Sequence, residues 1–139
     1  MNQNEINPAD LDQSIDADIT DTSTEPTASF DDLGLAPSIV SSVKAAGYTA
    51  PTPVQQQAIP AALAGGDLLV SSSTGSGKTA AFTLPALQRI LQARGDNNKR
   101  REKGVVHGPR VLVLAPTREL ALQVGKACET YGRHIQGLR

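Results

Sequence analysis

Apolar residues recur at helical spacing in four stretches of the chain, and the pattern begins shortly after Phe30. The spacing predicts helices over residues 37–46, 53–64 and 80–91, and a fourth helix that opens at Pro116-Thr117.

Glycine and proline mark the ends of these predicted helices. Gly47 and Gly65 follow the last apolar positions of the first two helices, as C-terminal glycines commonly do. Thr52-Pro53 has the order of an N-cap followed by a proline in the first turn. Pro60 and Pro85 lie inside predicted helices, so we expect a bend or a break at each.

Two short runs between the helices have the composition of strands. Residues 67–73 begin with Asp-Leu-Leu-Val and then pass into small polar residues. Residues 111–115 are apolar throughout, which is typical of a strand covered on both faces. The order helix, strand, helix, strand, helix predicts an α/β fold with a parallel sheet.

Charge divides the chain into two parts, although the formal net charge is only -1. The first 32 residues contain 9 of the 14 Asp and Glu and none of the 13 Lys and Arg. Because apolar residues are sparse in residues 1–29, we interpret them as a disordered acidic tail and residues 30–139 as the folded domain. Leu11, Ile15 and Ile19 recur every four residues, which leaves open a helix that docks on a protein partner. The basic remainder favours a polyanion as partner.

Length, cysteine content and hydropathy exclude several classes of protein. The 139 residues fit one small domain. Cys128 is the single cysteine, which excludes a disulfide framework and a multi-cysteine zinc site and predicts a reducing, cytoplasmic location. No apolar run approaches the length of a membrane span, and the N-terminus lacks the basic start and apolar segment of a secretory signal, so we expect no membrane partner.

The segment Ser72-Ser73-Thr74-Gly75-Ser76-Gly77-Lys78-Thr79 is the strongest chemical signal. Gly75 and Gly77 allow successive backbone N–H groups to point at phosphates, and the helix behind them adds its positive end. Lys78 can reach the β- and γ-phosphates, and Thr79 offers a hydroxyl to Mg²⁺. The strict pattern has glycine where this chain has Ser72. The alternative is a Gly/Ser-rich turn with an incidental Lys-Thr.

Gln55 and Phe30 are candidates for recognising a base. A glutamine side chain donates and accepts in the pair that adenine N6–H and N7 require, and an aromatic ring can stack on the base. The alternative is a capped helix with a surface glutamine, in which Phe30 and Tyr48 hold the neighbouring helices.

Pro116, Thr117 and Arg118 directly follow the second predicted strand. A helix N-terminus at the carboxyl end of a parallel strand is a common ligand site, and this one could hold a phosphodiester. The alternative is an ordinary N-cap with Arg118 in solvent. The basic residues Lys99 to Lys103 of the loop 94–110 could add non-specific phosphate contacts or could simply be solvated.

Taken in order, residues 30–139 resemble the start of the first RecA-like domain of DEAD-box RNA helicases. Residues 30–35 resemble the family's upstream aromatic segment, residues 47–60 its Q motif, residues 72–79 motif I and residues 116–120 motif Ia. The resemblance implies an incomplete RecA-like P-loop domain with a parallel β-sheet, preceded by the acidic tail.

The resemblance also implies ATP and Mg²⁺ as cofactors and RNA as the partner. The complete enzyme, expected to be a monomer, would couple ATP binding and hydrolysis to the unwinding of RNA duplexes. The implied roles are adenine recognition by Phe30 and Gln55, phosphate binding by the amides of residues 72–79 and by Lys78, Mg²⁺ binding by Thr79, and contacts of Pro116, Thr117 and Arg118 with the backbone of one RNA strand. Lys78 and Thr79 are the implied catalytic residues.

No Asp-Glu-Ala-Asp sequence occurs in the 139 residues. The carboxylates of that motif and the arginines of a second domain are therefore missing, so we expect this chain alone to be catalytically inactive. We also expect the strand at 111–115 to lack neighbours and to expose leucine and valine at an unpaired edge. Two other interpretations stay open, a stand-alone nucleotide- or RNA-binding module and another P-loop ATPase.

Overall fold

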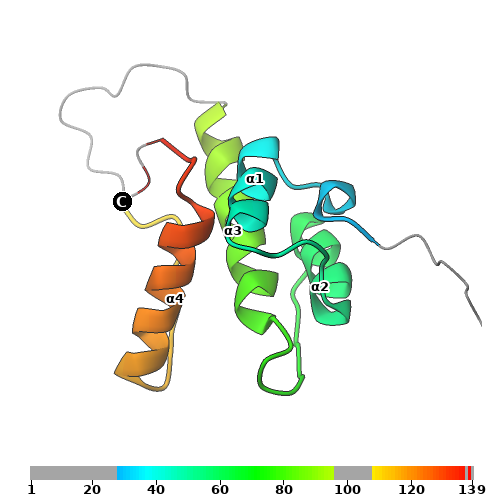
Figure 1. The fold of residues 1–139 in the computed structure, drawn as a ribbon. Helices are drawn as coiled ribbons and strands as arrows, with labels where there is room; N and C mark the ends of the chain where they lie inside the picture. The colour runs from blue at the N-terminus through cyan, green and yellow to red at the C-terminus, as the bar shows by residue number, and fades with distance from the viewer. Residues whose placement is uncertain (1–27, 96–107, 137, 139) are drawn as a thin grey trace, which may run out of the picture.

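The computed structural model describes residues 28–95, 108–136 and 138. These residues form a short 3₁₀ helix and four α-helices, which are η2 (Phe30–Leu33), α1 (Pro37–Ala45), α2 (Pro53–Leu63), α3 (Lys78–Gly95) and α4 (Arg118–Tyr131). Helix α3 lies in the centre and contacts α1, α2 and α4 (Figure 1). The predicted acidic tail, apart from its last two residues, and the basic run Lys99 to Lys103 fall outside the described residues.

Side chains at the N-caps explain where two of these helices begin. Ser29 and Asp32 form a reciprocal capping box at the start of η2, and Thr52 and Gln55 form another at the start of α2. Each box satisfies two backbone N–H groups that a helix otherwise leaves without partners. The predicted boundaries of α1 and α2 are confirmed to within one residue.

The predicted break at Pro85 is wrong, since α3 runs without interruption from Lys78 to Gly95. Proline removes one helical hydrogen bond, but Leu84 and Leu87 on either side are buried in the core. Their packing holds the helix across the lost bond. Helix α2 is likewise continuous through Pro60.

The hydrophobic core lies where η2, α1, α2 and α3 meet the C-terminal part of α4. Its buried members are Phe30, Leu33, Leu35, Ile39, Val40, Val43, Ile59, Ala80, Leu84, Leu87, Tyr131 and Ile135. Within α4, Val124 is buried, whereas Leu120 is 37% exposed. The N-terminal half of α4 therefore lacks a packed neighbour on the side where a sheet was predicted.

The parallel sheet predicted from residues 67–73 and 111–115 is not formed among the described residues. Both segments run without regular secondary structure, and no backbone hydrogen bond between described residues joins them. A strand is stable only when it is paired and covered, and the part of the chain that the structure describes supplies neither segment with a partner. The expectation of exposed leucine and valine is confirmed, because Leu112 and Leu114 are 77% and 85% exposed.

Candidate nucleotide-binding site

We call residues 67–71 and 111–115 the two extended segments. The loop of residues 72–79 turns sharply from the first of them into α3. Gly75 and Gly77 have φ angles of +82° and +85°, and no other residue type adopts positive φ in the described part of the chain. Backbone with this conformation strongly favours glycine. Gly75 and Gly77, which the sequence analysis singled out, are thus the two residues of this loop whose backbone conformation requires glycine.

Ser72, which stands where the strict pattern has glycine, closes the loop through its side chain. Its hydroxyl lies 2.5 Å from that of Ser76, and its carbonyl accepts a hydrogen bond from the Lys78 ammonium. Ser72 does not need positive φ. The departure from the strict pattern is therefore compatible with the turn and adds a contact across it.

The N-terminus of α3 offers free hydrogen-bond donors beside this loop. Among the described residues, the backbone N–H groups of Gly77, Lys78 and Thr79 donate to no other group. The helix has no acidic residue in its first turn, so nothing neutralises its positive end, and Lys78 adds an exposed charge there. This donor set fits a phosphate group, and the Thr79 hydroxyl fits the coordination preferences of Mg²⁺.

Gln55 connects α2 to the loop. The residue is 3% exposed; its Oε1 accepts from the Thr52 N–H at 3.0 Å, and its Nε2 donates to the Gly77 carbonyl at 3.2 Å. The sequence did not predict the bond to Gly77. Thr52-x-x-Gln55 is a capping-box pattern, and it could have shown that this side chain turns back toward the helix start. A nucleotide read by Gln55 would share or displace these two bonds.

Phe30 lies in the core and is 1% exposed. Its ring has no open face in this structure, so stacking on a base would require it to leave the core. The placement matches the alternative in which Phe30 holds the neighbouring helices together. Tyr48 packs edge-on against Tyr131, with ring centroids 6.2 Å apart.

Pro116, Thr117 and Arg118 lie exposed at the N-terminus of α4. The Thr117 hydroxyl accepts a hydrogen bond from the Leu120 N–H at 3.2 Å, so Thr117 is the N-cap of this helix. Helices α3 and α4 begin at the same end of the molecule (Figure 1). The positive end of α3 and the N-terminus of α4, whose first turn contains Glu119, therefore face the same region of solvent.

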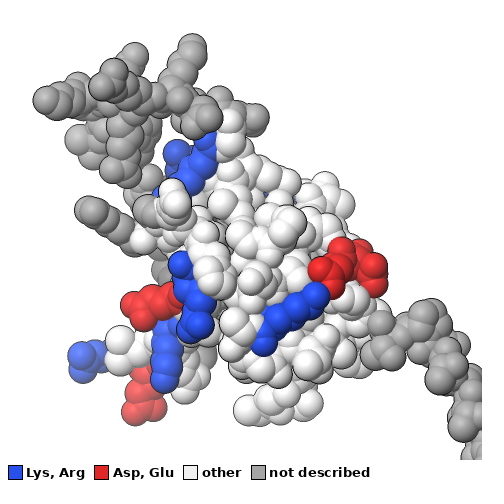
Figure 2. Space-filling model, turned by 45° about the horizontal axis from the view of Figure 1, so that its top comes forward, with Lys and Arg blue, Asp and Glu red and all other residues white. Residues whose placement is uncertain are grey.

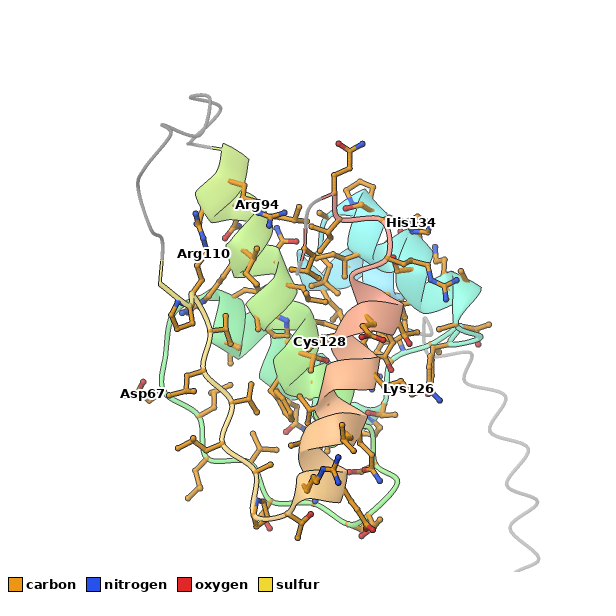
Figure 3. All side chains as sticks on the ribbon, turned by 90° about the vertical axis from the view of Figure 1, so that its left-hand side faces the viewer. Asp67, Arg94, Arg110, Lys126, Cys128 and His134 are labelled. Atoms are coloured by element: carbon orange, nitrogen blue, oxygen red, sulfur yellow. The ribbon has the colours of Figure 1, made fainter. Side chains whose placement is uncertain are left out.

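An open cavity of about 990 Å³ lies between helices α2 and α3 and the two extended segments. Lys78 and Thr79 line it, as do three further charged residues, Asp67, Arg89 and Arg110. Asp67 is the first residue of the segment 67–73, and Arg110 directly precedes the segment 111–115 (Figure 3).

Basic side chains do not form one continuous patch on the face shown in Figure 2, where small charged groups of both signs are separated by uncharged surface. In the described part of the chain no cluster of three or more His, Cys, Asp or Glu side chains could hold a metal ion. Mg²⁺ at Thr79 would therefore take most of its ligands from a nucleotide and from water. No described helix is both long enough and apolar enough to cross a membrane.

Several known proteins of similar sequence are named as RNA helicases. The family model for DEAD/DEAH box helicases matches residues 52–139. The "ATP-dependent RNA helicase DeaD" of Haemophilus influenzae is 46% identical over 110 residues, which cover 79% of this chain and 16% of that protein. The "ATP-dependent rRNA helicase rrp3" of Emericella nidulans is 46% identical over 121 residues, which cover 85% of this chain and 23% of that protein.

A solved structure agrees with these similarities. The RNA helicase Prp28 from Chaetomium thermophilum, crystallised with ADP, superposes with a TM-score of 0.66 at 38% identity over 78% of this chain and 24% of its own. The likeness supports the expected RecA-like fold, and the chain spans less than a quarter of the length of each of these three proteins. The family model alone covers more than half of the residues, and this chain belongs to the DEAD/DEAH box helicase family.

Proposed function

We propose that this chain carries the ATP-binding elements of a DEAD-box ATP-dependent RNA helicase, a complete enzyme that couples ATP binding and hydrolysis to RNA unwinding. The observation that carries the proposal is the junction at residues 72–79. There, two glycines with positive φ, three free backbone N–H groups and the Lys78 ammonium converge at one helix N-terminus. The phosphates of ATP occupy this junction, and the Thr79 hydroxyl binds the Mg²⁺ that accompanies them.

Adenine recognition is assigned to Gln55. Its amide lies beside the loop through the Gly77 bond, which is close enough for a nucleotide held by the loop to reach it. A second amide proton and a second lone pair remain for the base, but Gln55 is 3% exposed, so a base reaches them only if this side chain moves. Phe30 has no part in this assignment, because its ring is buried.

RNA binding is assigned to Pro116, Thr117 and Arg118 at the start of α4. The exposed Arg118 side chain and the free N–H groups of the first turn are donors suited to a phosphodiester. Contacts of this kind carry no base information, so binding is expected to be largely independent of RNA sequence.

The 139 residues alone are expected to bind nucleotide without turning it over. They contain no Asp-Glu-Ala-Asp sequence, and stabilisation of the transferring phosphate normally needs carboxylate-held Mg²⁺ and an arginine. The free Cys128 favours a reducing, cytoplasmic location.

The test is a titration of the chain with fluorescent ATP in the presence of Mg²⁺. Lys78→Ala removes a charge-assisted contact and is expected to weaken binding by roughly tenfold or more. Lys44→Ala is the matched control, because Lys44 is an exposed lysine on α1 whose ammonium pairs with Asp31 at 2.6 Å, away from the loop. Equal affinities of the two variants would contradict the proposal. Gln55→Ala should reduce the preference for ATP over GTP, measured as the ratio of the two affinities.

A further inference from the structure

The loop of residues 72–79 is hydrogen-bonded to itself in this structure. The hydroxyls of Ser72 and Ser76 lie 2.5 Å apart, so one of them donates to the other across the turn. The Ser76 N–H donates to the Ser73 carbonyl at 3.3 Å, and the Lys78 ammonium donates to the Ser72 carbonyl. We call the arrangement with these three bonds the closed conformation of the loop.

Two of the three bonds engage donors that a phosphate group would use. Backbone N–H groups of a glycine-rich turn and a lysine ammonium are the donors that hold phosphate oxygens in sites of this kind. In the closed conformation the Ser76 N–H and the Lys78 ammonium are each directed at a carbonyl oxygen of the loop. A phosphate that takes both donors must therefore replace the carbonyls of Ser72 and Ser73, which requires the loop to open.

The Ser72 side chain adds a bond that the strict sequence pattern does not provide. That pattern has glycine at this position, and glycine has no hydroxyl with which to bond Ser76. Ser72 and Ser76 are both partly buried, so water competes only in part for their hydroxyls. The bond joins the first residue of the loop to the residue between its two glycines, and it therefore holds together the two sides that separate when the loop opens.

We infer that Ser72 determines the nucleotide affinity of this chain, because its hydroxyl stabilises the closed conformation and so weakens the binding of ATP. The inference rests on the proposed function and adds to it a residue that sets the affinity of the same site. A bond made only in the closed conformation lowers the observed affinity by the factor by which it reduces the population of open loops. The net strength of one hydrogen bond between uncharged groups corresponds to a factor of roughly three to ten.

The test is stopped-flow binding of fluorescent ATP, with Mg²⁺, to the purified chain. Ser72→Ala removes the hydroxyl but keeps the carbonyl, and it should raise the association rate constant roughly threefold to tenfold. The dissociation rate constant should not change, because the bond is absent from the open loop. Ser76→Ala removes the other half of the same bond, so the double variant should bind no faster than either single variant. Ser71→Ala is the matched control, because Ser71 is an exposed serine just before the loop whose hydroxyl bonds to no described residue, and it should leave both constants unchanged.

Amide hydrogen exchange without added nucleotide tests the closed conformation directly. The Ser76 N–H should exchange faster in Ser72→Ala than in the parent chain, because its bond to the Ser73 carbonyl depends on the closed turn. Equal exchange of this amide would overturn the inference alone. So would Lys78-dependent binding that Ser72→Ala leaves unchanged or weakens, or an equal gain in Ser71→Ala. If neither the parent chain nor Ser72→Ala bound nucleotide, the proposed function and the inference would fail together.

Discussion

Replacing Gly77 with alanine tests whether Gln55 holds the phosphate-binding loop. The new Cβ would collide with the Gln55 side-chain amide and lie 3.2 Å from the Thr52 hydroxyl. Gly75 supplies the control, since it has nearly the same φ angle and a Cβ added there would meet no atom within 4 Å. The two substitutions therefore share the backbone cost and differ in the contact with Gln55.

The backbone cost of alanine at positive φ is about 1–2 kcal/mol, and both variants carry it. Gly77→Ala additionally displaces the bond from Gln55 Nε2 to the Gly77 carbonyl, worth about 1 kcal/mol, and disturbs the capping box of α2, worth about another 1 kcal/mol. We therefore expect Gly77→Ala to lower the free energy of unfolding by about 2 kcal/mol more than Gly75→Ala does.

Urea unfolding followed by circular dichroism measures this difference. The same two substitutions in a Gln55→Ala background complete the cycle, and there the extra cost of Gly77→Ala should largely disappear. Equal destabilisation of the two glycine variants in the parent chain would refute the reasoning. A difference that persists without Gln55 would show that some other neighbour of Gly77 is responsible.

Three further outcomes can be checked on the same chain. Thr52→Ala should cost about 1 kcal/mol of stability through the lost cap, whereas Thr49→Ala, at an exposed position outside the helix, should cost almost nothing in the same urea experiment. Burial, with the Tyr48 hydroxyl beside it, raises the pKa of Tyr131 to about 12. The folded chain then keeps a proton that an unfolded tyrosine loses near pH 10, so stability should fall as pH rises from about 10 to 12, and Tyr131→Phe should reduce that loss. Purified chain given Mg²⁺ and ATP should release no more phosphate than Lys78→Ala does; steady turnover that this substitution abolishes would show that the 139 residues suffice for catalysis.

Local signals in the sequence predicted the helices well. Thr52-Pro53 and Gly47 act on the backbone within one helical turn of their own position. The boundaries they predicted agree with those of α1 and α2 to within one residue. The break expected at Pro85 was wrong because a non-local effect outweighs a local one. Leu84 and Leu87 of α3 are buried in the core, and their packing against residues of other elements stabilises the helix across Pro85.

Local signals did not predict the strands correctly. Residues 111–115 have strong strand composition, yet a strand is defined by hydrogen bonds to a neighbour, and no described residue supplies one. Composition therefore could not predict the conformation of the segment, and the exposure of Leu112 and Leu114 was expected from the missing neighbours rather than from composition. Phe30 shows that a motif in the sequence does not determine the surroundings of a side chain. The motif predicted that its ring stacks on a base, whereas in the structure the ring is buried in the hydrophobic core.

The candidate site also has a part that depends on nearby contacts and a part that depends on residues far apart in the sequence. Its loop depends on contacts between α2 and α3, through Gln55 and Gly77, and these form without any sheet among the described residues. Side chains that would act on the bound phosphates belong, by the family's pattern, to a segment that these residues do not contain. Under the proposed function, triphosphate binding depends on two packed helices and on the turn that leads into α3, whereas hydrolysis depends on side chains that these residues lack. For this reason we expect nucleotide affinity and nucleotide turnover to separate cleanly in this chain, the first responding to Lys78 and Gln55 and the second absent whatever those residues are.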